Sequence, residues 1–164
     1  MTVDIPTPFE LPAATVLPEW IDHNGHMNMA YYLVAFDLAS DVLAENLGLT
    51  SEYKKRTNTA TFAGETHIAY KRELLEGDPL RITGRVIACD AKRMHYWLEM
   101  YHGTQGYLAA TTEFLILHVA MSVRRVAAME PEQLARIEAV RDAHSALPTP
   151  AGLGHVMGVP GQSG

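Results

Sequence analysis

Hydrophobic and polar positions follow two periods along this chain, one typical of a helix and the other typical of strands. Residues 29–47 are almost entirely apolar or small, which predicts a helix buried on most sides. Asn28 is a favourable N-cap residue and Gly48 supplies a C-terminal stop. The only charges in this helix are acidic and spaced by four residues, so they share one stripe: Asp37, Asp41 and Glu45.

From residue 59 onward, apolar and polar residues alternate, which predicts strands. Four strand regions follow one another between turn signals, at residues 59–72, 80–89, 93–102 and 107–124. Ahead of the helix, residues 13–17 predict one short strand after an extended, proline-containing lead-in over residues 1–12. Residues 131–146 predict a polar C-terminal helix that begins with Pro131.

This order of elements predicts an α+β fold in which an antiparallel sheet curls around a long central helix. We expect a single domain over residues 1–146, because the sequence shows no internal repeat and no sign of a second domain. Residues 147–164 contain repeated Gly and Pro with little periodicity, which predicts a mobile tail.

The composition narrows the functional classes. With 48% hydrophobic and 20% charged residues the chain is typical of a globular protein, and its formal net charge of -6 argues against a nucleic-acid partner. The single cysteine, Cys89, excludes an intramolecular disulfide and suits a reducing compartment. The sequence shows neither a signal peptide nor an apolar run of the roughly 20 residues that cross a bilayer. We therefore expect a cytoplasmic protein without a membrane partner.

The densest group of chemically reactive residues lies just before the long helix. Residues 20–28 read WIDHNGHMN and contain one carboxylate, two imidazoles and two side-chain amides. The first backbone N–H groups of a helix have no partner within it, so they can hold an anion or a polarised carbonyl oxygen. Asp22 is therefore the best candidate for a nucleophile or general base. Its alternative role is a hydrogen bond to the backbone of its own loop.

Other titratable residues extend the candidate site. Glu65 and His67 lie two apart on a predicted strand and share one face. If that face meets the loop, Glu65 could be a second acid or the true base; otherwise it pairs with a neighbouring cation. His23, His26 and His67, together with Asp22, invite a metal interpretation. Their spacing matches no zinc motif, so we expect no metal and no other cofactor.

Basic and aromatic residues suggest where a ligand would bind. The pairs Lys71-Arg72 and Lys92-Arg93 each adjoin a predicted strand, where they can grip a phosphate-bearing ligand, although solvated charge at a turn is the commoner role. Several aromatic residues could hold an aromatic or cationic group, although such residues are more often part of a core: Trp20, Tyr31, Tyr32, Tyr70, Tyr96 and Trp97.

The loop and the first turn of the helix resemble a known signature. Residues 22–28, DHNGHMN, followed by Ala30-Tyr31-Tyr32, resemble the D-x-x-G-H-x-N-x-x-Y motif of hotdog-fold acyl-CoA thioesterases, in particular the 4-hydroxybenzoyl-CoA thioesterase class. The segments PEWIDHNGHMNMAYY and DAKRMHYWLEM are most similar to betainyl-CoA thioesterases, which occur alone or fused to carnitine dehydrogenases in carnitine breakdown. The resemblance covers residues 13–124 and implies a hotdog fold.

The resemblance also implies catalytic roles. Asp22 corresponds to the carboxylate that attacks the thioester carbonyl or activates water, and the backbone N–H of Met29 would polarise that carbonyl. Asn28 would cap the helix and His26 would line the site. Glu65 has no counterpart in the 4-hydroxybenzoyl-CoA class; other hotdog thioesterases use a Glu, but on the helix, so the resemblance assigns Glu65 no role.

Binding roles follow in the same way. Lys92 and Arg93 match a basic segment that holds the CoA phosphates, and we expect Lys71 and Arg72 to contribute to the same task. The substrate pocket is expected to include aromatic and histidine side chains near the loop: Trp20, Tyr31, Tyr32 and His67. CoA is then part of the substrate and not a cofactor. Such folds pair as homodimers, often as dimers of dimers, with sites at the interface.

Two other functions remain open from the sequence. Hotdog hydratases and dehydratases also combine Asp with His, and Asp22 with His26 could serve that chemistry, although their usual longer spacing is absent. A non-catalytic acyl-CoA-binding module is the second alternative. The thioesterase interpretation predicts hydrolysis of an acyl-CoA, with betainyl-CoA as one candidate, to the free acid and CoA.

Overall fold

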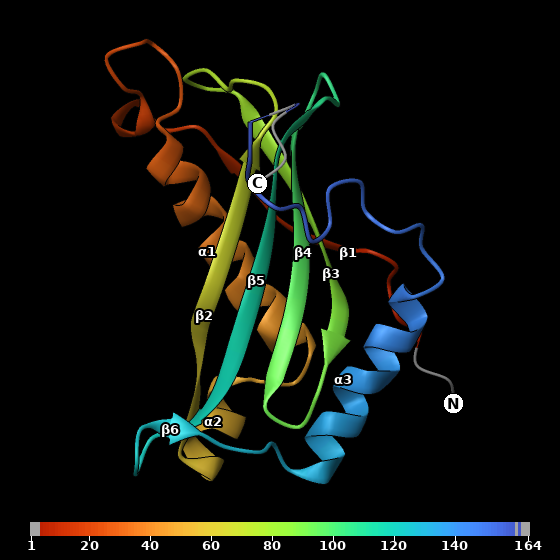
Figure 1. Cartoon of the computed structure of the whole chain (residues 1–164). Coiled ribbons are helices and arrows are strands. Elements are labelled where there is room, and N and C mark those ends of the chain that lie inside the picture. The colour runs from red at the N-terminus through yellow and green to blue at the C-terminus, as the bar shows by residue number, and fades with distance from the viewer. Residues whose placement is uncertain (1–3, 160, 162–164) are drawn as a thin grey trace.

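The computed structural model describes residues 4–159 and residue 161, so the parts of the predicted lead-in and tail at residues 1–3, 160 and 162–164 lie outside it. One antiparallel sheet with the strand order β1-β3-β4-β5-β2 curls over a long helix, α1, which lies behind the sheet in Figure 1. In chain order the elements are β1 (Phe9–Thr15), a 3-10 turn (Pro18–Trp20), α1 (Met29–Asn46), α2 (Ser51–Thr57), β2 (Thr59–Tyr70), β3 (Pro79–Cys89), β4 (Arg93–His102), β5 (Leu108–Ala120), β6 (Arg125–Val126) and α3 (Pro131–His144). This architecture confirms the predicted α+β fold with a central helix and a C-terminal helix.

The core lies between α1 and the concave face of the sheet. Phe36 and Leu43 of α1 are fully buried, and the sheet contributes Tyr96, Leu98 and Phe114 to the same cluster. Because side chains alternate across a strand, these sheet residues turn toward the helix while their neighbours turn outward. The predicted boundaries of α1 are confirmed to within one residue.

The prediction that α1 is buried on most sides is wrong. Its acidic stripe is exposed as expected, but so is an adjoining apolar stripe, in which Met29 is 68% and Leu38 is 60% exposed; Leu33 and Val34 belong to it. The sheet curls around one side of the helix only, so the apolar sequence of the helix predicted more burial than the structure shows. The exposed stripe is a candidate contact surface for another chain.

The N-terminal strand begins earlier than predicted, at Phe9 instead of residue 13. Phe9 and Leu11 are buried and pair with β3, and the register shifts between Leu11 and Ala14, around Pro12. β1 lies at an edge of the sheet, where a proline without an N–H can be accommodated at a bulge. The prolines of this segment therefore do not prevent strand formation.

The other edge of the sheet is β2, a strand of 12 residues that pairs only with β5 among the described strands. It ends at Tyr70, two residues before the predicted limit, and the chain then leaves the sheet toward the helix start. The last predicted strand region, residues 107–124, divides into β5 and a turn, and Arg124 at φ 51 leads into β6.

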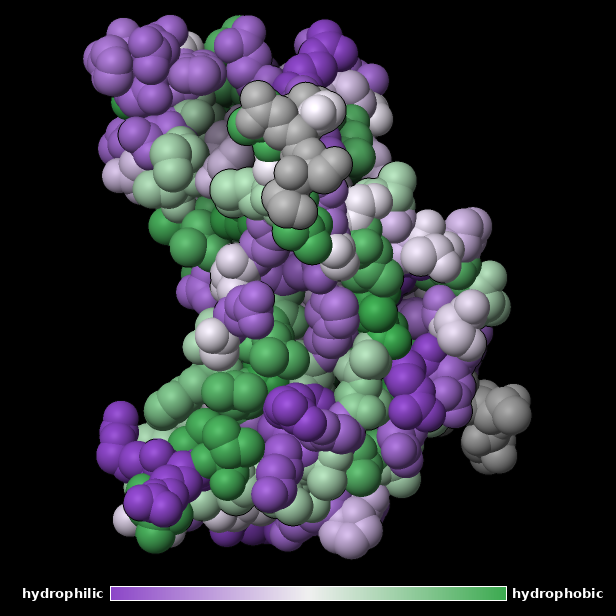
Figure 2. All heavy atoms as spheres, viewed as in Figure 1, coloured by the Kyte–Doolittle hydropathy of each residue, from purple (hydrophilic) through white to green (hydrophobic). Residues whose placement is uncertain are grey.

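The outer face of the sheet carries polar and apolar side chains intermixed (Figure 2). The described part of the predicted tail runs across this face: the Gly154 N–H donates to Glu113 of β5, and the His155 ring stacks on His67 of β2 with centroids 6.2 Å apart. The mobility of the tail stays a prediction. None of the described helices is long and apolar enough to span a membrane.

Candidate active site

The residues before α1 form a small hairpin that fixes the position of Asp22. Ile21 and Met27 form a β-bridge, and the Asp22 N–H donates to the His26 carbonyl at 3.0 Å. The Gly25 N–H donates back to the Asp22 carbonyl, also at 3.0 Å, with Gly25 at φ 82. Because L-residues with side chains rarely adopt this φ, Gly25 allows the tight turn that holds Asp22 and His26 side by side.

Backbone hydrogen bonds tie this hairpin to the elements around it. The Met27 N–H donates to the Leu74 carbonyl, and the Asn28 N–H donates to the Trp20 carbonyl, both at 2.8 Å. The buried Trp20 ring stacks on Tyr31 of α1 with centroids 5.6 Å apart. Trp20 and Tyr31, which were predicted to line the pocket, support the hairpin from behind instead.

The start of α1 leaves one backbone donor available. The Asn28 side chain accepts a hydrogen bond from the Ala30 N–H at 2.9 Å, which confirms Asn28 as the N-cap. Within residues 4–159, the Met29 N–H has no hydrogen-bond partner. An unpaired N–H at the positive end of a helix dipole is suited to polarise a carbonyl oxygen.

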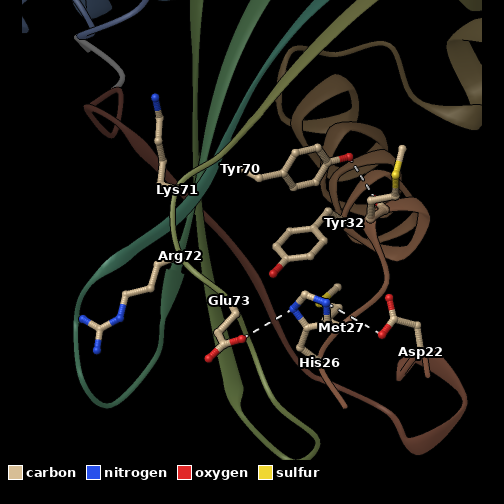
Figure 3. A pocket seen from close by; sticks show the side chains of 9 residues that line it. Asp22, His26, Met27, Tyr32, Tyr70, Lys71, Arg72 and Glu73 are labelled. Atoms are coloured by element: carbon tan, nitrogen blue, oxygen red, sulfur yellow. Dashed lines mark hydrogen bonds and ion pairs between the residues drawn. The ribbon is translucent and has the colours of Figure 1, made fainter. Parts of the chain in front are cut away.

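These features border a pocket of about 420 Å³ (Figure 3). Its lining comes from three places, the hairpin, the first turn of α1, and the end of β2 with the chain that follows it: Asp22, His26, Met27, Met29, Tyr32, Tyr70, Lys71, Arg72 and Glu73. Six of the residues predicted for the site therefore share one pocket, Asp22, His26, Met29, Tyr32, Lys71 and Arg72.

The two oxygens of Asp22 have different surroundings. Oδ1 accepts the Asn24 N–H at 2.8 Å and lies 3.7 Å from His26 Nε2. Among the described residues Oδ2 has no partner, and Figure 3 shows it directed away from His26. The role of Asp22 as a hydrogen-bond acceptor within its own loop is confirmed at Oδ1. Its role as nucleophile or general base stays a prediction, for which Oδ2 is available. The side chain is only 16% exposed, which limits competition from water.

His26 lies between two carboxylates. Its Nε2 faces Asp22, and its Nδ1 lies 3.5 Å from the carboxylate of Glu73 (Figure 3). Glu73 was not among the predicted site residues. Nothing in the segment KRE after a strand marks its third residue as part of a site, and only the fold brings it to the hairpin.

Two tyrosines form the apolar part of the pocket. Tyr32 of α1 and Tyr70 of β2 meet edge to face with ring centroids 5.2 Å apart, and the Tyr70 hydroxyl donates to the Met29 carbonyl at 3.0 Å. Burial raises the pKa of Tyr32 to about 12, so this phenol stays neutral near physiological pH. Tyr70 had been noted only as one of several aromatic residues, and its place on the helix-facing side of β2 brings it here.

Two cations stand at the rim. Lys71 and Arg72 follow β2 directly, and the Arg72 guanidinium lies over the Tyr107 ring, 3.9 Å from its centroid. Stacking on an aromatic face holds an arginine in place while its N–H groups stay available for an anion. Figure 3 shows both side chains directed away from His26.

Glu65 and His67 are not brought to this pocket. They share a face of β2, as predicted, but it is the outer face, where they border a hollow with His95, Glu113 and Leu115. Tyr70, three residues after His67, lies on the opposite side of the strand, so the face of Glu65 does not meet the hairpin. Within the part of the chain that the structure describes, no three His, Cys, Asp or Glu side chains gather closely enough to hold a metal ion.

Lys92 and Arg93 also lie away from this pocket. They occupy the turn between β3 and β4, at the end of the sheet away from the start of α1 in Figure 1, and Arg93 pairs with Asp90 at 2.6 Å. Their expected contact with CoA stays a prediction. Cys89, at the end of β3, is half-buried, and burial raises the pKa of its thiol, which disfavours a reactive thiolate.

Comparison with known proteins places the fold and the site in context. Residues 16–137 match the thioesterase-like superfamily. A betainyl-CoA thioesterase of Pseudomonas aeruginosa is 38% identical over 94% of this chain and 95% of its own length. A fused L-carnitine dehydrogenase/betainyl-CoA thioesterase of Rhizobium sp. is 30% identical over 92% of this chain, which spans 30% of that longer protein.

The fold has a similar relative among solved structures. A Staphylococcus aureus protein solved in complex with CoA has a TM-score of 0.86 at 28% identity and covers 98% of this chain and 100% of its own. The sequence and the structure thus lead to the same group of proteins. Because the family match covers most of the chain and the Pseudomonas relative aligns over almost its whole length, the chain belongs to the thioesterase-like superfamily, with the hotdog fold of its structural neighbours.

Proposed function

We propose that this thioesterase hydrolyses betainyl-CoA, an acyl-CoA with a small quaternary ammonium acyl group, to betaine and CoA. The observation that carries the proposal is that Asp22 Oδ2 and the Met29 N–H, neither of which has a partner among the described residues, meet in one pocket. A carboxylate and a backbone donor are what acyl transfer from a thioester requires. The choice of acyl group is supported by the names of the relatives.

The reaction can follow either of two routes from this geometry. In the first, Asp22 Oδ2 attacks the thioester carbonyl carbon, CoA leaves as the thiolate, and water then hydrolyses the mixed anhydride. In the second, Asp22 takes a proton from water as that water attacks the carbonyl carbon, and the tetrahedral intermediate then breaks its C–S bond, so that CoA leaves as the thiolate and takes up the proton. The Met29 N–H stabilises the negative charge that develops on the carbonyl oxygen in both routes.

The tyrosine pair is suited to a cationic acyl group. A quaternary ammonium group is attracted to the negative face of an aromatic ring and cannot donate a hydrogen bond. Tyr32 and Tyr70 supply two rings at right angles beside the Asp22 carboxylate, while the cations Lys71 and Arg72 point away toward the rim. The pocket thus separates an aromatic, acidic side for the acyl group from a basic rim for the CoA phosphates.

We infer that the active form is a homodimer, which can associate further into a homotetramer. β2 is a long edge strand with unpaired backbone groups, and such an edge is suited to pair with the same strand of a second copy. The exposed apolar stripe of α1 lies next to this edge, where the Tyr70 hydroxyl reaches Met29. A molar mass by light scattering that stays at one chain at micromolar concentration would contradict this inference.

The direct test of the activity is thiol release, measured with Ellman's reagent, from a panel of acyl-CoAs. The panel contains betainyl-CoA and tert-butylacetyl-CoA, a neutral acyl-CoA of the same shape. We expect a kcat/KM for betainyl-CoA about five- to thirtyfold above that for the neutral analogue, because cation–π attraction in a desolvated pocket contributes about 1–2 kcal/mol.

Each other outcome has a distinct meaning. Equal rates on the two analogues keep the hydrolysis and remove the betainyl preference. Preference for an aromatic or long-chain acyl-CoA assigns the pocket to another substrate. If no thioester is hydrolysed, CoA binding without turnover would favour an acyl-CoA-binding module, and a change in enoyl absorbance would favour a hydratase.

A further inference from the structure

We propose that Glu73 is a positioning residue of this active site, which acts through His26 to hold the Asp22 carboxylate in its reactive orientation. The inference rests on the proposed thioester hydrolysis at Asp22 and adds a residue to it. It starts from the position of His26 between two carboxylates, in which His26 Nδ1 lies 3.5 Å from Glu73 and His26 Nε2 lies 3.7 Å from Asp22 (Figure 3).

The backbone of Glu73 is held in place although its side chain is exposed. The Tyr107 hydroxyl donates to the Glu73 carbonyl at 3.0 Å. The next residue, Leu74, is fully buried, and its carbonyl accepts the Met27 N–H of the hairpin at 2.8 Å. The segment that carries Glu73 is thus fastened to the same hairpin that carries His26, so the distance between the two side chains is set by the fold.

The neighbouring cation does not neutralise Glu73. Arg72 stacks on Tyr107, and Figure 3 shows its guanidinium on the side of the chain away from His26. Glu73 lies nearer to the hairpin, and one of its carboxylate oxygens faces the imidazole. The carboxylate is therefore directed at His26 and not at the adjacent guanidinium.

A carboxylate near each nitrogen, at 3.5 Å and 3.7 Å, favours one orientation of the imidazole ring. A rotation of the His26 ring about its side-chain bonds would break one of the two carboxylate contacts. With Nδ1 directed at Glu73, Nε2 stays directed at Asp22 Oδ1, which also accepts the Asn24 N–H. Oδ1 then accepts the Asn24 N–H and faces the imidazole, which leaves Oδ2 as the oxygen available to a substrate. Removal of Glu73 frees the ring and, with it, the Asp22 carboxylate.

The test compares Glu73→Gln with Glu76→Gln. Both changes remove one negative charge from the connection between β2 and β3, and both side chains are exposed, but Glu76 is not part of the pocket lining. Thiol release from betainyl-CoA and from tert-butylacetyl-CoA gives kcat and KM for each variant. We expect Glu73→Gln to lower kcat about tenfold with KM within about twofold, because a charged contact that orients a reacting group is lost. Glu76→Gln keeps the wild-type values.

A double-mutant cycle with His26→Asn tests whether Glu73 acts through the imidazole. If it does, Glu73→Gln has no further effect on kcat once His26 is replaced. Glu73→Asp, which keeps the charge but shortens the side chain, is expected to recover part of kcat. It also provides a second variant if Glu73→Gln fails to fold, and thermal unfolding of every variant reports the fold.

Three results would overturn the proposal. Wild-type kcat in Glu73→Gln would show that the contact is not used. A rise in KM for betainyl-CoA alone would mean that Glu73 touches the cationic acyl group directly, and full additivity with His26→Asn would exclude an effect through the ring. If the wild-type protein hydrolyses no thioester, the proposed function fails and this inference with it. Failure of the inference alone leaves the wild-type activity intact.

Discussion

The two faces of the sheet near β2 carry similar residue types in different arrangements. On the helix side, Asp22 and His26 lie beside the start of α1. On the outer side, His95 and Glu113 border a hollow together with His67 and Glu65. In the outer cluster, both oxygens of Glu113 are engaged, one by His95 Nε2 at 3.0 Å and the other by the N–H of Gly154.

The difference between the two clusters shows what makes a group of polar residues reactive. Asp22 keeps one oxygen unpartnered among the described residues, and it faces a helix N-terminus with an available N–H. Glu113 has a comparable exposed fraction, 15% against 16%, but its carboxylate is consumed by structural contacts. In the proposed mechanism, an unpartnered carboxylate oxygen next to a preorganised donor, and not residue type or burial, distinguishes the catalytic carboxylate from the structural one.

The largest expected effect separates these two carboxylates. Asp22→Asn is expected to lower kcat by roughly 10²–10⁴-fold, because an amide is neither a nucleophile nor a general base. Glu113→Gln, the matched change on the other face, is expected to leave kcat within about twofold, since an amide still accepts one hydrogen bond. Thiol release from betainyl-CoA measures both. Normal turnover by a folded Asp22→Asn protein would show that another residue is responsible for catalysis.

A second effect concerns the aromatic side of the pocket. Tyr70→Leu is expected to raise KM for betainyl-CoA by about tenfold relative to the neutral analogue, because it removes one ring face worth about 1 kcal/mol or more to a cation. Tyr70→Phe retains the face and serves as the control, losing only the hydrogen bond to the Met29 carbonyl. An equal loss in both variants would attribute the effect to that hydrogen bond instead.

A smaller effect is expected at the basic rim. Lys71→Ala is expected to raise KM about threefold at low salt, with the difference shrinking as ionic strength rises, because an exposed lysine attracts phosphate through a screened charge. Lys55→Ala, an exposed lysine in α2 away from the pocket, is the control. The same measurement on Lys92→Ala and Arg93→Ala tests their predicted contact with CoA. Because these two residues lie away from the pocket of their own chain, a second copy of the chain would have to bring them to this site.

The smallest effect is on stability. Asn28 and Thr50 cap α1 and α2 in the same way, since each side chain accepts a backbone N–H of the first helical turn. Asn28→Ala and Thr50→Ala are each expected to lower the free energy of unfolding by about 1 kcal/mol in urea titrations. Only Asn28→Ala is expected to lower kcat as well, because it loosens the turn that presents the Met29 N–H. Equal kcat values in the two variants would remove Asn28 from the catalytic arrangement.

Local patterns were sufficient to predict most of the elements. The cap at Asn28, the stop at Gly48 and the turns between strands depend on residues close in sequence, so the predicted bounds of α1, β3 and β4 agree with the structure to within one residue. The prediction was wrong at β1 and for the burial of α1. A bulge at a sheet edge tolerates Pro12, and the number of sides from which a helix is covered depends on segments distant in the chain.

The sequence by itself determined the hairpin and helix start that carry Asp22, His26, Asn28 and the Met29 N–H, because all four lie within eight consecutive residues. Only the tertiary structure decided what joins them. Tyr70 and Glu73 enter the pocket because β2 runs beside α1 and because the Met27 N–H donates a hydrogen bond to the Leu74 carbonyl. Glu65 and His67 are excluded because strand alternation turns them to the outer face. The alternation of Ile68 and Tyr70 with Glu65 and His67 indicates that the two pairs face opposite ways. Which distant segments meet each face is set by packing, which local patterns do not specify.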